Sequence, residues 1–160
     1  DLVRAAATIS EFSGVERRFQ LKGEVNDITI IDDYAHHPTE IKATLAAARM
    51  RFGRQPIWAV LQPHTFSRTL NLLPEFAAAF ADADHVIVLD IYPSRETDDG
   101  RVSSRDLVRH MRHPDAIYIG PMRDAADYLI AHLTAPAALL TLGAGDGYLV
   151  GEWVLEQLSQ

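Results

Sequence analysis

Short apolar runs recur along the chain, separated by longer segments in which apolar residues return at helical spacing. Such short runs are typical of strands that are covered on both faces. The runs predicted to be strands are residues 28–31, 57–61, 86–89, 116–119 and 138–142. The segments predicted to be helices are one that follows Pro38, with Ile41, Leu45 and Ala48 on one face, and residues 72–83, 104–111, 122–133 and 148–158.

This alternation predicts a single α/β domain with a mostly parallel, Rossmann-like sheet and helices on both of its faces. Parallel strands need long crossovers, and helices of this length supply them with the usual right hand. A further, half-exposed strand is predicted at residues 19–25, where apolar and polar residues alternate. Residues 1–12 are predicted to be a helix that ends near Gly14, and a helix that starts at once on Asp1 indicates a piece of a longer protein.

The composition is that of an ordinary globular domain and narrows the classes of partner. The 160 residues are 48% hydrophobic and 23% charged, with a net charge of −7. An acidic surface repels phosphate backbones and anionic lipid, so we expect neither nucleic acid nor a membrane as a partner. The absence of cysteine excludes disulfides and a cysteine nucleophile, and no apolar run approaches the ~20 residues of a membrane span. A cytoplasmic location is therefore expected.

The strongest chemical signal follows the first buried strand, where residues 32–40 read Asp-Asp-Tyr-Ala-His-His-Pro-Thr-Glu. Ligands of open α/β sheets bind beyond the carboxyl ends of the strands, which places these side chains at a potential site. Taken singly, any one of them is explained as well by capping of backbone groups or by simple exposure to solvent. Two acids, a phenol and two imidazoles in a single loop favour function.

A second polar loop, Gln-Pro-His-Thr-Phe-Ser-Arg-Thr at residues 62–69, follows the next strand. If the two strands are neighbours, His64 and Arg68 face His36 across a crevice. Arginine holds a carboxylate through two parallel hydrogen bonds, which makes Arg68 a candidate receptor for such a ligand. The structural alternative is that Arg68 pairs with a local acid. Ser67 is expected to cap the following helix.

Weaker signals lie elsewhere along the chain. Asp90 ends the third buried strand, and capping is its simplest interpretation. Residues 143–147, Gly-Ala-Gly-Asp-Gly, resemble a phosphate-binding turn, but a tight turn with positive φ at glycine explains them better. Arg17 and Arg18 are either a surface pair or include an arginine that swings over a phosphate. The chain has neither the G-x-x-x-x-G-K-[ST] loop that cradles ATP phosphates nor a G-x-S-x-G nucleophile elbow.

Four of these segments together resemble the Mur ligases, the amide-forming enzymes of peptidoglycan synthesis in the cell wall. Residues 32–41 are similar to the signature loop of the members that add the first alanine, and residues 62–69 to their second signature. Residues 14–19, Gly-Val-Glu-Arg-Arg-Phe, resemble the segment that joins the central and C-terminal domains. Residues 143–146 resemble the last motif, so the resemblance covers nearly the whole chain.

The resemblance implies that residues 15–160 are a C-terminal, amino-acid-binding lid domain. Residues 1–14 are then the tail of the last helix of the central, ATP-binding domain, together with the linker. The implied reaction joins L-alanine to the carboxylate of UDP-N-acetylmuramate: ATP, with Mg²⁺ on its phosphates, converts the carboxylate to an acyl phosphate that the alanine amine attacks. The domain alone is expected to be inactive, because ATP and Mg²⁺ are held mainly by the central domain, and no metal site is expected in it.

The resemblance also implies roles for single residues. The residues implied to bind L-alanine are Tyr34, His36, His64 and Arg68, the last two at its carboxylate. Thr65 stands where some members carry arginine, which leaves more of the carboxylate charge to Arg68. Arg18 and Asp33 are implied to bind the nucleotide, Arg18 at the phosphates and Asp33 at the ribose hydroxyls. Arg18 and His36 are the implied catalytic residues.

Three alternatives remain open. A related Mur ligase recycles a tripeptide onto the same sugar and shares the first loop, although its second loop differs. A stand-alone nucleotide-binding α/β module fits the fold without catalysis. A metal-dependent hydrolase needs His36, His37 and His64 around one zinc ion, which adjacent imidazoles reach with difficulty.

Overall fold

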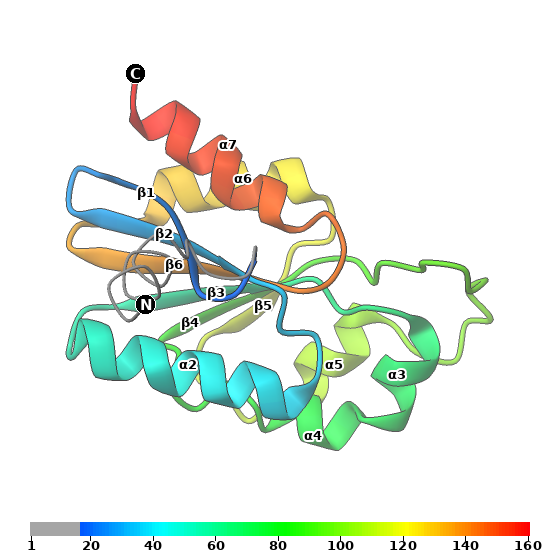
Figure 1. Ribbon diagram of the computed structural model, residues 1–160. Helices are drawn as coiled ribbons and strands as arrows, with labels where there is room; N and C mark the ends of the chain where they lie inside the picture. Colours follow the sequence, from blue (N-terminus) through cyan, green and yellow to red (C-terminus); the bar gives the residue numbers. More distant parts are fainter. Residues whose placement is uncertain (1–16) are drawn as a thin grey trace, which may run out of the picture.

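A six-stranded sheet crosses the centre of the molecule, which the computed structural model describes over residues 17–160 (Figure 1). The strands lie in the order β1-β2-β6-β3-β4-β5. All neighbouring pairs are parallel except β1 and β2, which form an antiparallel hairpin. The strands are β1 (Gln20–Val25), β2 (Ile28–Asp33), β3 (Ile57–Leu61), β4 (His85–Val88), β5 (Ala116–Tyr118) and β6 (Ala137–Leu142). The predicted α/β fold with a mostly parallel sheet is therefore confirmed.

Helices cover both faces of this sheet. In Figure 1, α6 and α7 lie above it, and α2, α4 and α5 lie below it. The helices are α2 (Pro38–Phe52), α3 (Phe66–Asn71), α4 (Leu73–Ala77), α5 (Ser104–His110), α6 (Met122–His132) and α7 (Tyr148–Leu158). Along residues 17–160, no helix is long and apolar enough to cross a membrane. The helix expected over residues 1–12 and the domain tail expected at residues 1–14 lie outside the described residues.

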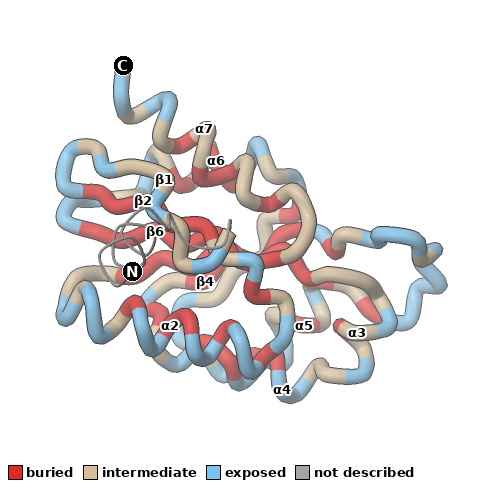
Figure 2. Tube along the Cα trace, in the orientation of Figure 1, coloured by how far each residue is buried: buried red, intermediate tan, exposed pale blue. Residues whose placement is uncertain are grey.

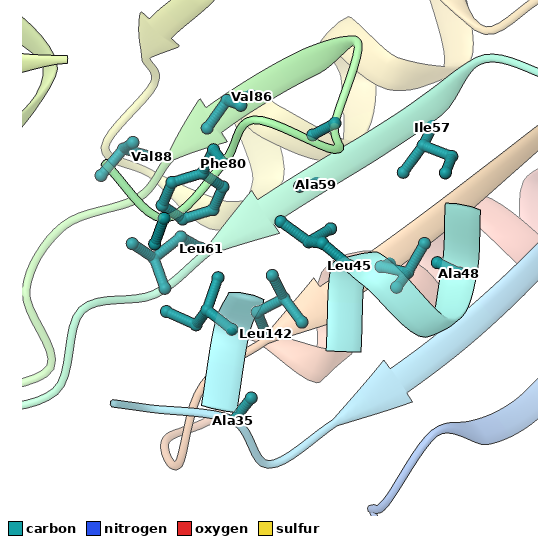
Figure 3. Close-up of a cluster of buried hydrophobic side chains, with 14 of the residues drawn as sticks. Ala35, Leu45, Ala48, Ile57, Ala59, Leu61, Phe80, Val86, Val88 and Leu142 are labelled. Carbon is teal, nitrogen blue, oxygen red and sulfur yellow. The ribbon is translucent and has the colours of Figure 1, made fainter. Parts of the chain in front are cut away.

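Two apolar layers hold the helices to the sheet, because successive side chains of a strand point to opposite faces. Ile57 and Leu61 of β3 belong to the layer between the sheet and α2, whereas Trp58 belongs to the layer between the sheet and the helices α6 and α7. Figure 3 shows the first layer, in which Leu45 and Ala48 of α2 lie against β3. Figure 2 shows that buried positions are concentrated in the strands. Each fully buried leucine contributes about 1.5–3 kcal/mol, which favours strands that are apolar throughout.

The prediction of one helix over residues 72–83 is wrong in its extent. The chain instead forms α3, which begins earlier, and the short α4, which ends earlier. Pro74 explains the break, because proline lacks an N–H and its fixed φ suits the first turn of a helix rather than its interior. Residues 78–83 continue in turns and bends, and Phe80 remains buried in the core.

Candidate functional site

The carboxyl ends of the parallel strands meet along one edge of the sheet, at the right of Figure 1. β6 lies between β2 and β3, so the two polar loops do not follow neighbouring strands. The loops nevertheless converge on each other. The rings of His36 and His64 lie edge to face with their centroids 6.1 Å apart. The imidazoles expected to face each other therefore do so, although the strand order behind them is different.

Asp33, at the end of β2, ties the segment before β1 to the loop after β2. Its Oδ2 accepts a hydrogen bond from the backbone N–H of Phe19 at 2.8 Å, and its Oδ1 accepts one from Ala35 at 2.8 Å. A carboxylate oxygen accepts two hydrogen bonds, so each oxygen retains a free lone pair. Asp33 shapes the loop and keeps acceptors for a ligand hydroxyl.

A cavity of about 310 Å³ opens beside Asp33. It lies between the segment before β1, the loop after β2 and the first turns of α2, and its lining includes Arg18, Phe19, Asp33, Tyr34, Glu40 and Thr44. The two residues expected to bind a nucleotide, Arg18 and Asp33, thus share one hollow. Tyr34 borders this hollow and also contacts the ring of His36, with centroids 5.2 Å apart.

His36 has a defined proton arrangement in its neutral form. Its Nδ1 lies 3.0 Å from the carbonyl oxygen of Tyr34. A carbonyl oxygen only accepts, so Nδ1 carries the proton and donates it there. The neutral ring therefore leaves a lone pair on Nε2.

His37 is an N-cap, not a ligand. Its Nδ1 accepts a hydrogen bond from the backbone N–H of Thr39 at 3.3 Å, and Glu40 accepts from the backbone N–H of His36 and of His37. This reciprocal arrangement is a capping box that starts α2. Among residues 17–160, no three His, Cys, Asp or Glu side chains cluster closely enough to hold a metal ion. The zinc alternative therefore has no ligand set in this part of the chain.

His64 and Arg68 form a pair at the start of α3. Arg68 Nη1 lies 3.3 Å from His64 Nδ1, and since a guanidinium only donates, Nδ1 is the acceptor. Burial, and then the positive charges of Arg68 and His36, lower the pKa of His64 below its usual value. His64 is thus neutral near pH 7 and carries its proton on Nε2. The pair presents an N–H donor beside a permanent positive charge.

Ser67 does not cap α3, so that expectation is wrong. The N-cap residue is Thr65, which makes no side-chain capping bond and has a positive φ of 69°. Glu96, from the loop after β4, instead accepts hydrogen bonds from the hydroxyl and the backbone N–H of Ser67. These bonds lower the pKa of Glu96. The acceptor for a free backbone N–H at the start of α3 is therefore an acid distant in sequence and not the Ser67 side chain.

Tyr92, which was not singled out from the sequence, lies on the other side of His64 from His36. Its ring stacks on His64 with centroids 5.5 Å apart and an interplanar angle of 21°. The backbone holds this contact in place, because Thr65 N–H donates to the Tyr92 carbonyl and Tyr92 N–H donates to the Pro63 carbonyl, both at 2.8 Å. A continuous row of rings therefore runs across the sheet edge: Tyr34, His36, His64 and Tyr92.

The glycine turn after β6 is shaped around Gln62, a second residue that the sequence argument missed. Gln62 Oε1 accepts from Gly147 N–H at 2.8 Å, and its Nε2 donates to Asp146 at 2.7 Å. Gly143 has a φ of 143°, as expected for a turn glycine, and a Cβ there would lie 2.7 Å from the Gln62 carbonyl oxygen. At Gly145 the requirement is space alone, because a Cβ would overlap the Gln62 side chain. Nothing here requires a phosphate.

Arg17 is anchored, so the surface-pair interpretation is wrong for this residue. Its Nε donates to Asp32 Oδ2 at 2.8 Å, and its Nη1 and Nη2 donate to the carbonyl oxygens of Gly145 and Gly143 at 3.0 and 2.8 Å. Asp32 is only 1% exposed, and a buried carboxylate requires a positive partner. The burial of Asp32 is known only from the fold, so the sequence alone does not pair it with Arg17. Asp90 is likewise structural, since it accepts a hydrogen bond from the Tyr118 hydroxyl at 2.6 Å.

Comparison with known proteins gives a consistent result. The family described as Mur ligase, glutamate ligase domain matches residues 17–145. Over 160 residues, all of this chain, it is 51% identical to the UDP-N-acetylmuramate–L-alanine ligase of Roseiflexus castenholzii. Over 159 residues, 98% of this chain, it is 48% identical to the protein of the same name from Alkaliphilus metalliredigens. The chain covers 34% of each of these proteins, so it spans about a third of the curated relatives that it matches.

Solved structures share the fold. The UDP-N-acetylmuramate-alanine ligase of Thermotoga maritima superposes with a TM-score of 0.78 at 27% identity, covering 99% of this chain and 34% of that one. A domain of a Haemophilus ducreyi protein, described as a UDP-N-acetylmuramate:L-alanyl-γ-D-glutamyl-diaminopimelate ligase, gives a TM-score of 0.68 at 28% identity. That match covers 88% of this chain and 99% of the solved domain.

Proposed function

Because the chain belongs to the Mur ligase family, as its glutamate ligase domain, we propose that it is the amino-acid-binding domain of a UDP-N-acetylmuramate–L-alanine ligase. The proposed reaction forms an amide between the muramate carboxylate and L-alanine after ATP has phosphorylated that carboxylate. Identities of 51% and 48% over nearly the whole chain, both to alanine ligases, support alanine as the amino component. We place the reaction in the cytoplasm, where ATP is available.

The pairing of Arg68 with His64 carries this proposal. A free amino acid must be held by its carboxylate if its amine is to reach an acyl phosphate. Arg68 supplies a fixed charge, and one of its five N–H groups is used on His64. His64, kept neutral, adds an Nε2–H donor beside it. Together they are a carboxylate receptor at the mouth of the ring row.

His36 is the proposed base for the amine. The alanine ammonium must lose a proton before nitrogen can attack a carbonyl carbon. In the neutral ring, Nδ1 donates to the Tyr34 carbonyl, so the Nε2 lone pair is the atom that takes this proton. The ring lies next to His64, so a carboxylate on the receptor brings the amine of the same molecule toward His36.

Arg18 and Asp33 are the proposed nucleotide contacts. Both line the cavity of about 310 Å³ beside the ring row. The free lone pairs of Asp33 suit ribose hydroxyls, and the exposed guanidinium of Arg18 suits phosphate oxygens. The 160 residues contain no phosphate-cradling loop, so ATP and its Mg²⁺ are assigned mainly to another domain. On this proposal the chain alone is inactive.

The arrangement of the site on one open edge fits the role of a lid. An acyl phosphate hydrolyses in water, so a ligase that forms one benefits from a domain that closes over it. Holding the amine beside the acyl carbon lowers the activation barrier by several kcal/mol, up to about 7–11 in ideal cases. Asp33 and the row of rings that ends at Tyr92 form one wall of such a chamber. The opposite wall is assigned to the rest of the protein.

The test measures phosphate release by the full-length protein with UDP-N-acetylmuramate, ATP and one amino component at a time. We expect release with L-alanine and little with L-alanyl-γ-D-glutamyl-diaminopimelate. Glycine and L-serine serve as near-isosteric comparisons. Preference for the tripeptide would overturn the assignment of substrate, and release that needs no muramate would overturn the reaction itself.

A further inference from the structure

We infer that Arg17 is a positioning residue that fixes Arg18 over the nucleotide cavity, and this inference rests on the proposed nucleotide role of Arg18 and Asp33. Arg17 does not line the cavity, whereas Arg18, the next residue, does. All three side-chain nitrogens of Arg17 donate hydrogen bonds to protein oxygens. Its effect on a ligand must therefore pass through its neighbours.

The anchor joins three segments that are distant in sequence. The Arg17 guanidinium binds Asp32 at the end of β2 and the carbonyl oxygens of the glycine turn after β6. It also lies over two tyrosine rings, 5.2 Å from the centroid of Tyr34 and 4.8 Å from that of Tyr148 at the start of α7. Asp32 in turn accepts a hydrogen bond from the Thr141 hydroxyl at 2.8 Å. The segment that enters β1 is thus fixed to the centre of the sheet.

The backbone around Arg18 needs such an anchor. Arg17 has a φ of 58° and Phe19 a φ of 45°, so two non-glycine residues in the left-handed region flank Arg18. A non-glycine residue in this region is strained and persists only where its surroundings enforce the conformation. Two hydrogen bonds enforce it: Tyr34 N–H donates to the Arg17 carbonyl at 2.6 Å, and Phe19 N–H donates to the Asp33 carboxylate at 2.8 Å. The Arg17 side chain holds the same turn from its other side.

The two adjacent arginines therefore have different roles: Arg17 holds the turn, and Arg18 contacts the ligand. Arg17 is half-buried and engaged, whereas Arg18 is exposed and lines the hollow with Asp33. Without the anchor, the strained turn relaxes and both the direction of Arg18 and the Phe19–Asp33 bond are lost. The carboxylate receptor, His64 and Arg68, lies at the start of α3 and not among the groups that Arg17 contacts, so alanine binding is affected much less than nucleotide binding.

The chain contains a matched control in Arg49, near the end of α2. Its guanidinium also bridges one carboxylate and several carbonyl oxygens: Asp84 at 2.7 Å, Asp82 at 2.9 Å, Gly53 at 2.9 Å and Gln55 at 3.1 Å. It lies at the opposite end of α2 from His37 and the site. Loss of Arg49 therefore removes a comparable network without touching the nucleotide cavity.

The experiment compares Arg17→Met and Arg49→Met in the full-length protein. Three quantities are measured: the Kd of a non-hydrolysable ATP analogue by calorimetry, the KM values for ATP and alanine, and the melting temperature. For Arg17→Met we expect the analogue Kd and the ATP KM to rise about 10- to 100-fold, with the alanine KM changed less than about threefold. Arg49→Met should lower the melting temperature similarly and leave analogue binding unchanged.

Two further measurements protect the test against simple misfolding. Asp32→Asn keeps the shape of the anchor but removes its charge, and we expect the same selective loss of ATP-analogue affinity. Guanidinium ion added to Arg17→Ala should restore part of that affinity, since it fits the vacated position between Asp32 and the glycine turn. Unchanged analogue affinity in Arg17→Met, or equal losses in both arginine variants, would overturn the inference. A wild-type protein that binds the analogue but does not join alanine would refute the proposed function and leave this test intact.

Discussion

Replacing Arg68 with alanine in the full-length protein removes the permanent charge from the proposed carboxylate receptor. A hydrogen bond to a charged group contributes about 1.5–3 kcal/mol net, and each 1.4 kcal/mol corresponds to a factor of ten in affinity. Arg68 is half-buried and spends one N–H on His64, so several donors remain for a ligand. We expect the KM for alanine to rise about 10- to 100-fold, and the KM for ATP to change less than about threefold.

A second effect of this change follows from His64. Burial, and then the charges of Arg68 and His36, lower its pKa, so removing Arg68 raises that pKa again. In the variant, His64 gains a positive charge more readily as the pH falls toward 6 and replaces part of the lost attraction. The defect in alanine KM should therefore be smaller at pH 6 than at pH 8.

The assay is phosphate release against alanine concentration at saturating ATP and UDP-N-acetylmuramate, at several pH values. Arg68→Lys is the matched variant, because it keeps the charge but loses the planar fork. We expect it to fall between wild type and alanine. Equal rises in the KM for alanine and for ATP, or a defect that is the same for arginine, lysine and alanine at this position, would refute the receptor.

Three further changes test other parts of the site. Asp33→Ala should raise the Kd of an ATP analogue by calorimetry, because it removes the acceptors proposed for the ribose and frees the Phe19 N–H; unchanged nucleotide affinity argues against that role. Gln62→Ala leaves Gly147 N–H and Asp146 without their partner and should destabilise the domain by about 1–3 kcal/mol, seen as a lower denaturation midpoint; an unaltered midpoint contradicts the account of the glycine turn. The folded-state pKa of His64 is depressed, so the unfolded chain binds a proton more readily and stability is lost as the pH falls below about 6.5. His64→Gln should reduce that loss in melting curves between pH 7 and 5, and an identical pH dependence would show that His64 does not contribute.

The central strands could be predicted from the sequence because β2, β3 and β6 are buried on both faces, and continuous apolar runs are a direct record of that burial. Ile28 to Ile31 and Ala138 to Leu142 are examples. Strand order carries no such record, since any of these runs fits any central position. From the sequence alone β2 and β3 are therefore possible neighbours, whereas in the structure β6 lies between them.

Some residues of the candidate site could likewise be identified from the sequence, and others could not. Asp33, His36, His64 and Arg68 were found because they crowd two loops at strand ends. Arg17, Gln62, Tyr92 and Glu96 were missed because their partners are distant in sequence, as in the 84-residue separation between Gln62 and Asp146. Single residues of these types are common on surfaces, so only the fold shows that they act together. Ser67 illustrates the opposite error, in which a local capping rule was overridden by a glutamate from another loop.

The central place of β6 also has a consequence for how the protein is made. Of the six strands in residues 17–160, β6 is the last to leave the ribosome, yet it supplies the pairing edge for both β2 and β3. Until residues 137–142 emerge, the β1–β2 hairpin and the β3–β4–β5 unit have no shared edge, and two apolar strand edges stay open to wrong partners. The glycine turn that receives Arg17 is translated later still. The ligand edge of this domain is therefore assembled in one late event, well after the residues that give it its chemistry have been synthesised.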